Sequence, residues 1–433
     1  MAIAFDHQSN VFGSGSPEGD LTDDQLNSIA RESLADVPIG ARVLAIIPDK
    51  TRDDNTNILF PAAAAALATR EGTIDALVAQ GTHPAMSSAE KLAKIGADRG
   101  PIPNLGNIFD HRWNESNELT TIGELSADEV AKISGGLIAE AIPLRINHLL
   151  ASGDYDLILV FGATMPHEVA GFAGGAKYFF PGVAGPELTH KTHWLAAMAS
   201  VENIIGRVET PTRHLIEAAA EHINTPAISF TSVISRTADD RLRTHSLFVG
   251  NIKQALRQAT DVSRHVHIKY TSRKYRRVVA LLDKHYEDLW VGGKASYRIG
   301  GIIEDGGELL IFAPHLTRVS ETHGRDIIRF GGYAPLEKVK NLVATSAELR
   351  DNLCVAAHLS QVAFAGRRNE NGDLAMRYDI TLASALDAET CGKLNLKFMD
   401  VADFQISNYQ HDSDTLIVER AGRDLYLVAP TDS

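Results

Sequence analysis

The sequence repeats one pattern that strongly limits its possible folds: an apolar, strand-like run, then a polar loop, then a helical run. The loop DKTRDDNTN follows the first apolar run, and GTHPAMS follows the second. Strands that alternate with helices in this way are typical of βαβ units with parallel sheets. The sequence therefore predicts an α/β fold. The three repeats begin at ARVLAIIP, IDALVAQ and DYDLILVFG.

A second α/β region begins near residue 277, where RRVVALLD precedes the helical DLWVGGKASYRIGG and the strand ELLIFAP. The chain has 433 residues, more than a single hydrophobic core usually supports. We therefore expect two α/β domains with mainly parallel sheets and an active site in the interdomain cleft. The expected limits are 1–20 for an N-terminal arm, 21–255 and 256–433 for the domains, and about 240–275 for a polar, helical hinge.

Composition excludes several classes of function. The formal net charge of −13 argues against nucleic acid or an anionic membrane as the main partner. The only cysteines are Cys354 and Cys391, which leaves no disulfide framework and no cysteine-based zinc pattern. There is no signal-peptide pattern and no apolar run of the roughly 20 residues that span a bilayer. We expect a cytoplasmic protein that acts on a small molecule.

The predicted parallel sheet brings several polar residues together. Ligands of open parallel sheets bind outside the carboxyl ends of the strands, where the loops between strand and helix gather. The three loops of the repeats carry Asp49 and Arg52, then His83, then His167 and Lys177. We therefore expect these five side chains to lie at the same edge of the sheet.

Each of these residues has an ordinary and a functional interpretation. Lys177 could be a solvated loop lysine, but the glycines of GFAGGAK before it are typical of a covalent or anion-contacting site. Arg52 could belong to a solvated turn or could hold a carboxylate or phosphate, and Lys294 is a similar candidate in the second domain. His83 and His167 follow strands directly, which favours them as general bases.

The helical segment THKTHWLAAMA carries two further histidines, His190 and His193, three residues apart. This spacing can place two side chains on one helix face. A pair of this kind is more often a polar helix end than a metal site, and no HExxH motif accompanies it. The residues alone therefore leave both interpretations of the pair open.

Together these segments resemble the nickel-dependent lactate racemase family. DKTR (49–52) and GTHP (81–84) are similar to two motifs of that family, and DLWVGGK (288–294) is similar to a third in the second domain. HEVAGFAGGAKYFFPG (167–182) is similar to the most specific signature. The spacing between Lys177 and His193 also matches that between the family's tethering lysine and its nickel-ligating histidine.

The resemblance implies a nickel-pincer nucleotide, which is nickel bound to pyridinium-3,5-bisthiocarboxylic acid mononucleotide. Lys177 would tether it through a thioamide and His193 would ligate the nickel. His83 and His167 would act as bases while a hydride passes reversibly between substrate C2 and the cofactor. Arg52 and Lys294 would bind the substrate. The further cofactor-binding residues implied are Asp49, Thr51, Gly174, Gly175 and Trp290.

Four positions depart from the family pattern. Lys50 stands where the family often has histidine, and Ala176 replaces the commoner arginine. Trp290 and Val291 replace the Tyr-Gln pair of lactate racemase itself, whose glutamine lies near the substrate. We therefore expect a racemase or 2-epimerase of a 2-hydroxy acid other than lactate. A dicarboxylate, an aryl or aliphatic acid, and a sugar acid remain open, and cofactor-assembly enzymes are the expected protein partners.

Two other functions are compatible with the same residues. One is an isomerase of this fold that uses Lys177 and the histidines without nickel. The other is a non-catalytic protein that binds the pincer nucleotide or another small anion. The paired histidines His83 and His167 favour catalysis, because simple binding does not require two bases.

Overall fold

The computed structural model describes residues 11–81 and 83–430, so the first half of the predicted arm, residues 1–10, lies outside it. The described chain forms two compact units. The first unit runs up to Thr192 and also includes Val208–Val266. The second comprises His193–Arg207 and the chain from His267 onward. No helix among the described residues has the length and apolar character needed to cross a membrane.

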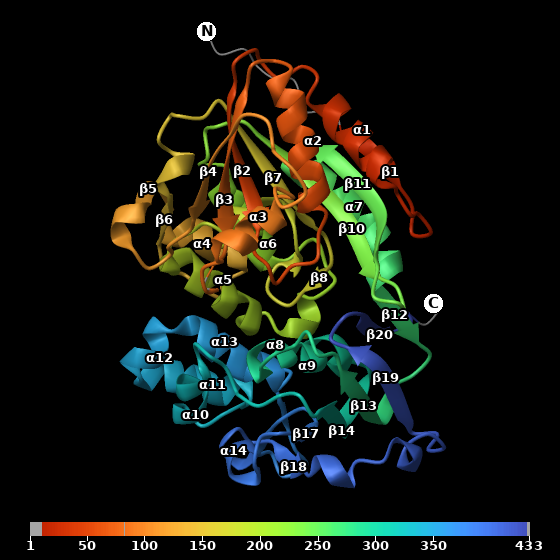
Figure 1. Cartoon of the computed structure of the whole chain (residues 1–433). Helices are drawn as coiled ribbons and strands as arrows, with labels where there is room; N and C mark the ends of the chain where they lie inside the picture. Colours follow the sequence, from red (N-terminus) through yellow and green to blue (C-terminus); the bar gives the residue numbers. More distant parts are fainter. Residues whose placement is uncertain (1–10, 82, 431–433) are drawn as a thin grey trace. The chain divides into compact units, whose positions relative to one another are not determined.

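The first unit is built on a seven-stranded sheet in the order β1-β11-β10-β7-β2-β3-β4 (Figure 1). Strands β10, β7, β2, β3 and β4 are parallel, whereas β11 and β1 are antiparallel additions. The mainly parallel α/β class predicted from the sequence is confirmed. The strands are β1 (Val11–Gly15), β2 (Arg42–Pro48), β3 (Thr73–Ala79), β4 (Leu105–Asp110), β7 (Leu157–Ala163), β10 (Ala227–Arg236) and β11 (Leu242–Gly250).

The strand order reverses between β2 and β7. From β2 the chain moves outward to β3 and β4, and it then returns to β7 on the opposite side of β2 before continuing to β10. At such a topological switch point the neighbouring loops diverge, which leaves a crevice at the carboxyl ends of the two strands. The first unit therefore has one place where its topology favours a ligand.

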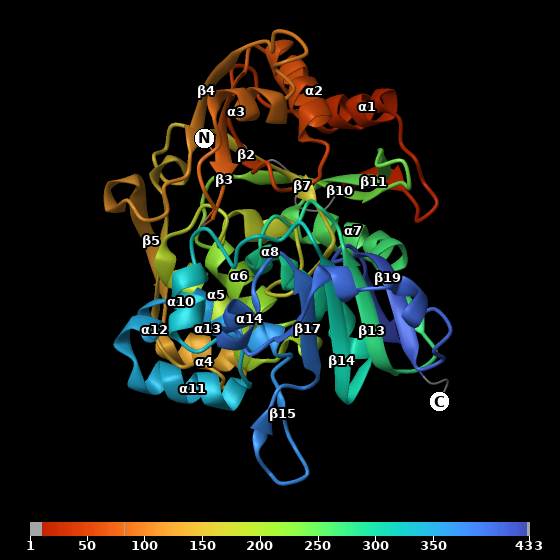
Figure 2. The ribbon, with the colours of Figure 1, turned by 60° about the horizontal axis from the view of Figure 1, so that its bottom comes forward.

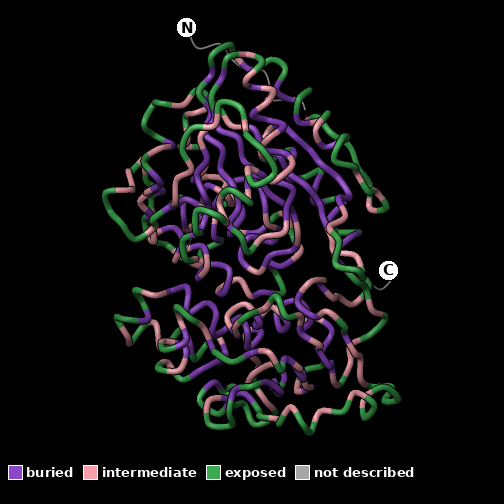
Figure 3. Tube along the Cα trace, viewed as in Figure 1, coloured by how far each residue is buried: buried purple, intermediate pink, exposed green. Residues whose placement is uncertain are grey.

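Helices cover both faces of this sheet (Figure 2). On one face, α1 (Asp23–Ser33) and α2 (Thr56–Ala68) pack against alternate residues of the central strands. On the other face, α7 (Ile252–His267) packs against Val233 and Phe248. Because both faces are covered, the central strands are buried along most of their length (Figure 3). This double burial explains why β2 and β7 read as continuous apolar runs.

The second unit contains a five-stranded, fully parallel sheet in the order β18-β17-β14-β13-β19. Its order reverses between β13 and β19. Two short helices, α8 (Leu289–Gly292) and α9 (Lys294–Ile299), follow β13. The strands are β13 (Tyr275–Leu282), β14 (Ile303–Ala313), β17 (Asp379–Ser384), β18 (Lys397–Met399) and β19 (Thr415–Ala421).

Two segments differ from the sequence prediction. Val11–Gly15, predicted as part of an arm, pairs with β11 as an edge strand. Residues 242–250, predicted as polar and helical, form β11, and only α7 within 240–275 is an α-helix. The sequence did not predict this strand because several of its buried residues are polar and so do not form an apolar run. Their burial depends on hydrogen-bond partners, as for Thr244, whose hydroxyl accepts from Asn55 Nδ2 at 2.8 Å. The first unit extends to Val266. Nothing in the sequence indicated that His193–Arg207 belongs to the second unit.

The aromatic core of the first unit gives a stability prediction. Phe161 is fully buried, and its ring stacks on Phe230 with centroids 4.7 Å apart. We expect Phe161→Ala to lower the free energy of unfolding by about 3–5 kcal/mol, because it removes a large side chain from a packed interior. Phe12→Ala deletes the same ring from an edge position that is 39% exposed, and it should cost less than about 1 kcal/mol. Urea unfolding of both variants tests this, and equal losses would contradict it.

Candidate active site

The loops after β2 and β3 bring a carboxylate and a histidine into contact. Asp49 is buried, and its Oδ2 lies 2.9 Å from Nδ1 of His83. Thr51 donates to the other carboxylate oxygen from its backbone N–H and its hydroxyl. Burial alone would raise the pKa of Asp49, but the hydrogen bond from His83 and the charge of Arg52 outweigh it and hold the pKa below its usual value. An ionised Asp49 fixes the hydrogen of neutral His83 on Nδ1, which leaves a lone pair on Nε2.

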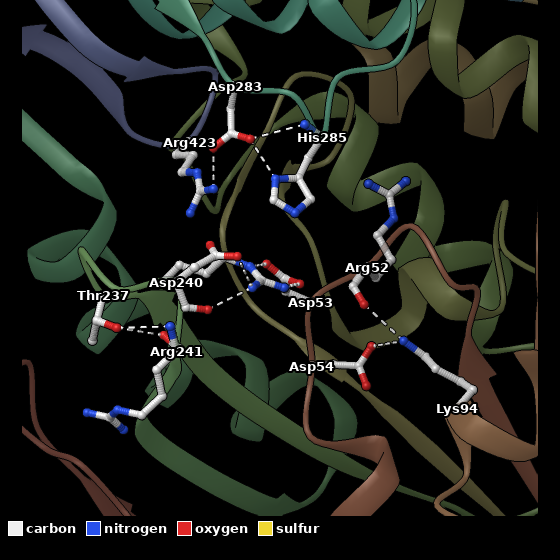
Figure 4. Close-up of polar contacts among 11 residues, drawn as sticks. Arg52, Asp53, Asp54, Lys94, Thr237, Asp240, Arg241, Asp283, His285 and Arg423 are labelled. Carbon is white, nitrogen blue, oxygen red and sulfur yellow. Dashed lines mark hydrogen bonds and ion pairs between the residues drawn. The ribbon is translucent and has the colours of Figure 1, made fainter. Parts of the chain in front are cut away.

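Arg52 lies in the same loop as Asp49. Its backbone oxygen accepts a hydrogen bond of 2.9 Å from Lys94, which also pairs with Asp54, and its guanidinium points away from that pair (Figure 4). Within the described ranges no ion pair or hydrogen bond engages this guanidinium. With Lys50 and Glu90, Arg52 also lines a cavity of about 320 Å³. An arginine in this state can bind a carboxylate or phosphate with two parallel hydrogen bonds.

The long loop after β7 carries the other two predicted residues. It forms a small hairpin from β8 (Pro166–His167) and β9 (Gly171–Phe172), and it then enters a short 3-10 helix that contains Lys177. Gly174 and Gly175 make this turn with φ angles of +97° and +63°. A Cβ on Gly174 would lie 2.8 Å from Thr164 Oγ1. The turn itself therefore requires these glycines, and their predicted contact with a cofactor stays a prediction.

Hydrogen bonds connect the loops after β3 and β7. The N–H of Gly81 donates to the carbonyl of Gly182 at 3.0 Å, and the N–H of Gly182 donates to the carbonyl of Lys177 at 3.1 Å. His83 lies two residues after Gly81. The structure thus gathers Asp49, Arg52, His83, His167 and Lys177 at the carboxyl edge of three neighbouring strands, as the repeated sequence pattern predicted. Thr51 lies in the same loop as Asp49.

His167 is held differently from His83. It is buried, and its Nδ1 accepts hydrogen bonds from the backbone N–H groups of Val169 at 3.1 Å and Ala170 at 3.4 Å. A neutral ring in this arrangement carries its hydrogen on Nε2. The carboxylate of Glu168 also lies 3.8 Å from Nδ1. The two histidines therefore present opposite tautomers, with a lone pair on Nε2 of His83 and a hydrogen on Nε2 of His167.

Lys177 lies among charged groups in a partly buried position. Burial lowers the pKa of its ammonium to about 7, and the charges of Arg52 and Arg213 also lower it, while Glu168 and Asp49 oppose them. Near neutral pH a large fraction of the side chain is therefore the free amine, the nucleophilic form of lysine.

The remaining predicted residues belong to the second unit. His193 lies on α5 (Pro186–Met198), which begins before the predicted THKTH segment, so both His190 and His193 are inside the helix. Trp290 lies on α8, and Lys294 is the first residue of α9. Both follow β13 and thus the switch point of the second sheet.

Trp290 is packed between two imidazole rings. Its ring centroid lies 4.3 Å from that of His323 and 4.2 Å from that of His358. The buried His358 in turn pairs through Nδ1 with the hydroxyl of Tyr297 at 2.5 Å. The sequence motif identified Trp290 but gave no indication of its two histidine neighbours, which lie far along the chain.

Two features of the first unit fit a covalently held mononucleotide. Lys177 offers an amine that can react near neutral pH, and Arg52 offers a guanidinium for an anionic group. No group of three or more His, Cys, Asp or Glu side chains that could hold a metal ion occurs in residues 11–81 and 83–430. The resemblance assigns only one protein ligand, His193, to the nickel.

The sequence prediction missed Arg213 on α6 (Pro211–Ala220). This arginine is 2% exposed, and its guanidinium donates to the backbone carbonyls of Ala170, Phe172 and Gly174. One signal was present in PTRHLIEAAA, because Arg213 shares the buried face of the helix with Ile216. A charged residue on an apolar helix face indicates a specific buried partner.

The sheet order defines a doubly wound α/β protein, and the loops at the switch point of its first unit form a candidate small-molecule site. Residues 19–206 match the model of the lactate racemase N-terminal domain. The resemblance predicted from the sequence motifs is thereby confirmed.

Two known proteins extend this comparison. The lactate racemase of Thermoanaerobacterium thermosaccharolyticum is 30% identical over 170 residues, which cover 39% of this chain and only 36% of that enzyme. The structure of the lactate racemase apoprotein from the same organism matches 97% of this chain and 100% of its own with a TM-score of 0.71, at 16% identity. This second match shows a shared fold.

A crystal structure of a Thermotoga maritima protein is more similar in sequence over the whole chain. It is 29% identical, has a TM-score of 0.84, and covers 95% of this chain and 100% of its own. Both units therefore have counterparts in solved structures.

The opposite tautomers of the two histidines can be measured directly. In 15N-histidine-labelled protein, we expect the neutral ring of His83 to show a protonated Nδ1 and a bare Nε2, and that of His167 to show the reverse. Long-range 1H–15N correlation spectra distinguish the two forms, and the His83→Gln and His167→Gln variants assign them. Asp49→Ala should remove the preference of His83 for a protonated Nδ1 and leave the tautomer of His167 unchanged. A bare Nε2 on His167 would contradict this arrangement.

The state of Lys177 gives a second prediction. Because its pKa is lowered, the reactive amine forms at lower pH, so competitive acetylation of Lys177 should be half-maximal near pH 7. Lys393 serves as the control, because its hydrogen bond to Glu389 raises its pKa and should delay its acetylation to higher pH. Mass spectrometry of labelled peptides measures both, and a Lys177 that titrates together with Lys393 would contradict the prediction.

Proposed function

We propose that this protein is a racemase or 2-epimerase of a 2-hydroxy acid. The observation that carries the proposal is the gathering of the Asp49–His83 pair, Arg52 and Lys177 at the switch point of the first sheet. The lactate racemase N-terminal domain within residues 19–206 supports an isomerase of this type. The fold shared with the lactate racemase apoprotein agrees with it.

Arg52 and His83 have complementary tasks in this proposal. The Arg52 guanidinium binds the substrate carboxylate, which orients the neighbouring carbon and its hydroxyl. Nε2 of His83 then accepts the hydroxyl proton. The resulting imidazolium is stabilised by the ionised Asp49 on the other side of the ring.

His167 contributes from the loop after β7. Because Nδ1 of His167 accepts from two backbone N–H groups, its Nε2–H would donate a hydrogen bond to the substrate oxygen. To act as the second base, which would serve the opposite stereoisomer, the ring would have to exchange these bonds. The carboxylate of Glu168 could then pair with a protonated Nδ1. The two-base scheme stays a prediction, and the tautomer measurement bears on it.

The proposed cofactor is the nickel-pincer nucleotide. Lys177 would hold it covalently, Asp49, Thr51, Gly174, Gly175 and Trp290 would contact it, and His193 would ligate its nickel. When bound, it supplies a reversible hydride acceptor for substrate C2. Arg52 and Lys294 would bind the substrate, and cofactor-assembly enzymes would be the protein partners.

The proposed substrate is a 2-hydroxy acid other than lactate. Trp290 and Val291 stand where lactate racemase has Tyr-Gln, and valine cannot replace the hydrogen bonds of an amide. The Trp290 ring is also fixed by His323 and His358. A rigid, bulky ring without a neighbouring amide favours recognition by shape over hydrogen bonding.

The test combines mass and isotope measurements. Protein made together with the cofactor-assembly enzymes should carry an adduct of pincer-nucleotide mass, and Lys177→Ala should abolish it. The loaded protein should interconvert the stereoisomers of at least one acid in a panel of 2-hydroxy acids. In D₂O the C2 hydrogen should remain with the product, because it moves as a hydride that does not exchange with solvent.

Variants and outcomes separate the alternatives. His83→Gln should keep the adduct and lower interconversion at least about 100-fold, as expected for loss of a general base. Extensive deuterium at C2 would contradict hydride transfer. It would favour proton abstraction by a nickel-independent isomerase. A loaded protein that is inert towards the whole panel would favour a non-catalytic carrier.

A further inference from the structure

Arg213 is the most deeply buried charged side chain that the proposed reaction does not use. Its guanidinium donates to the carbonyl of Ala170 at 3.2 Å, to that of Gly174 at 3.3 Å, and to that of Phe172. Within the described part of the chain it forms no ion pair, although Glu217 acts on it through space. Removing a guanidinium from water is costly unless its donors are satisfied, so these three carbonyls determine where it can lie.

The three carbonyls belong to alternate residues of one irregular segment. Ala170 ends the turn whose N–H groups bind Nδ1 of His167, and Gly174 lies three residues before Lys177. Phe172 is in the two-residue strand between them. Arg213 therefore bridges the histidine turn and the lysine turn with a single side chain.

This segment needs an external partner for its backbone. It contains no α-helix, its hairpin has only two residue pairs, and Gly171, Gly174 and Gly175 have positive φ angles. Buried carbonyls that lack regular secondary-structure partners must be satisfied by side chains or solvent. A planar guanidinium with several divergent donors can satisfy three at once, whereas a lysine ammonium is a compact point charge.

We propose that Arg213 is a positioning residue that holds the His167 turn and the Lys177 turn in one shared conformation, so that the lysine amine stays at the tether position. The inference rests on the proposed function, because it assigns a purpose to the fixed amine. The positive charge of Arg213 also opposes protonation of that amine.

The test is competitive acetylation with acetic anhydride, read at Lys177 in protein made without the assembly enzymes. In Arg213→Met the half-maximal pH should rise by at least about one unit, because loss of the charge and hydration of the loosened turn both favour the ammonium. Arg213→Lys keeps the positive charge but loses the planar guanidinium with its several donors, so the half-maximal pH should rise less than in Arg213→Met. The matched control is Arg264→Met, since Arg264 is an exposed arginine over the ring of Phe172 at 6.0 Å. Arg264→Met should leave the pH profile of Lys177 acetylation unchanged.

Hydrogen exchange supplies the second measurement. In Arg213→Lys, the amides of residues 169–177 should exchange about tenfold faster than in the unchanged protein, while those of β2 and β3 keep their protection. If Arg213→Met does not fold, Arg213→Lys alone carries the test. Unchanged exchange and an unchanged Lys177 profile in a folded variant would overturn the inference. A wild-type protein that takes no adduct would instead overturn the proposed function.

Discussion

The parallel pairing of β2 with β7 is the constraint on which the proposed site depends. Their hydrogen bonds align Val43 with Leu157 and Ile46 with Val160, so the two strands finish at the same edge of the sheet. The chain leaves them for opposite sides, because the strand order reverses between them. A switch point of this kind favours ligand binding, and the loops that begin at Asp49 and Thr164 both start there.

The charges of Asp49 and Lys177 depend on burial and on the groups around them. Asp49 stays ionised in a buried position because His83 and Arg52 compensate for lost solvation. For Lys177 burial is the largest influence and lowers the pKa, while the nearby charges are divided: Arg52 and Arg213 lower it further, and Glu168 and Asp49 raise it. The same surroundings thus keep the Asp49 carboxylate charged and lower the pKa of Lys177 to about 7. A proton acceptor and an amine nucleophile can consequently exist together near neutral pH.

Residues that follow a strand directly were the most predictable from the sequence. Asp49, His83 and His167 could be placed because a parallel sheet collects its loops at one edge, and only the strand assignments were needed. Arg213 could not be placed, because its partners are backbone carbonyls that no sequence pattern specifies. The strand β11 was missed for a related reason, since its polar residues are buried through partners distant in sequence. Periodicity thus predicts elements whose burial is apolar and can place a polar residue on a buried face, but it cannot identify the hydrogen-bond partners of that residue.

The sheet of the second unit has the same topological feature as the sheet of the first. Strands β14, β17 and β18 lie in succession on one side of β13, and β19 lies on the other side. The strand order of this sheet therefore also reverses beside its first strand. The DLWVGGK motif follows β13 just as DKTR follows β2. In each unit, the first parallel strand of the sheet therefore carries a motif at the position where a doubly wound fold leaves a crevice. This placement gives DLWVGGK a physical basis for a functional role that does not depend on sequence resemblance, because the strand order alone selects the loop after β13.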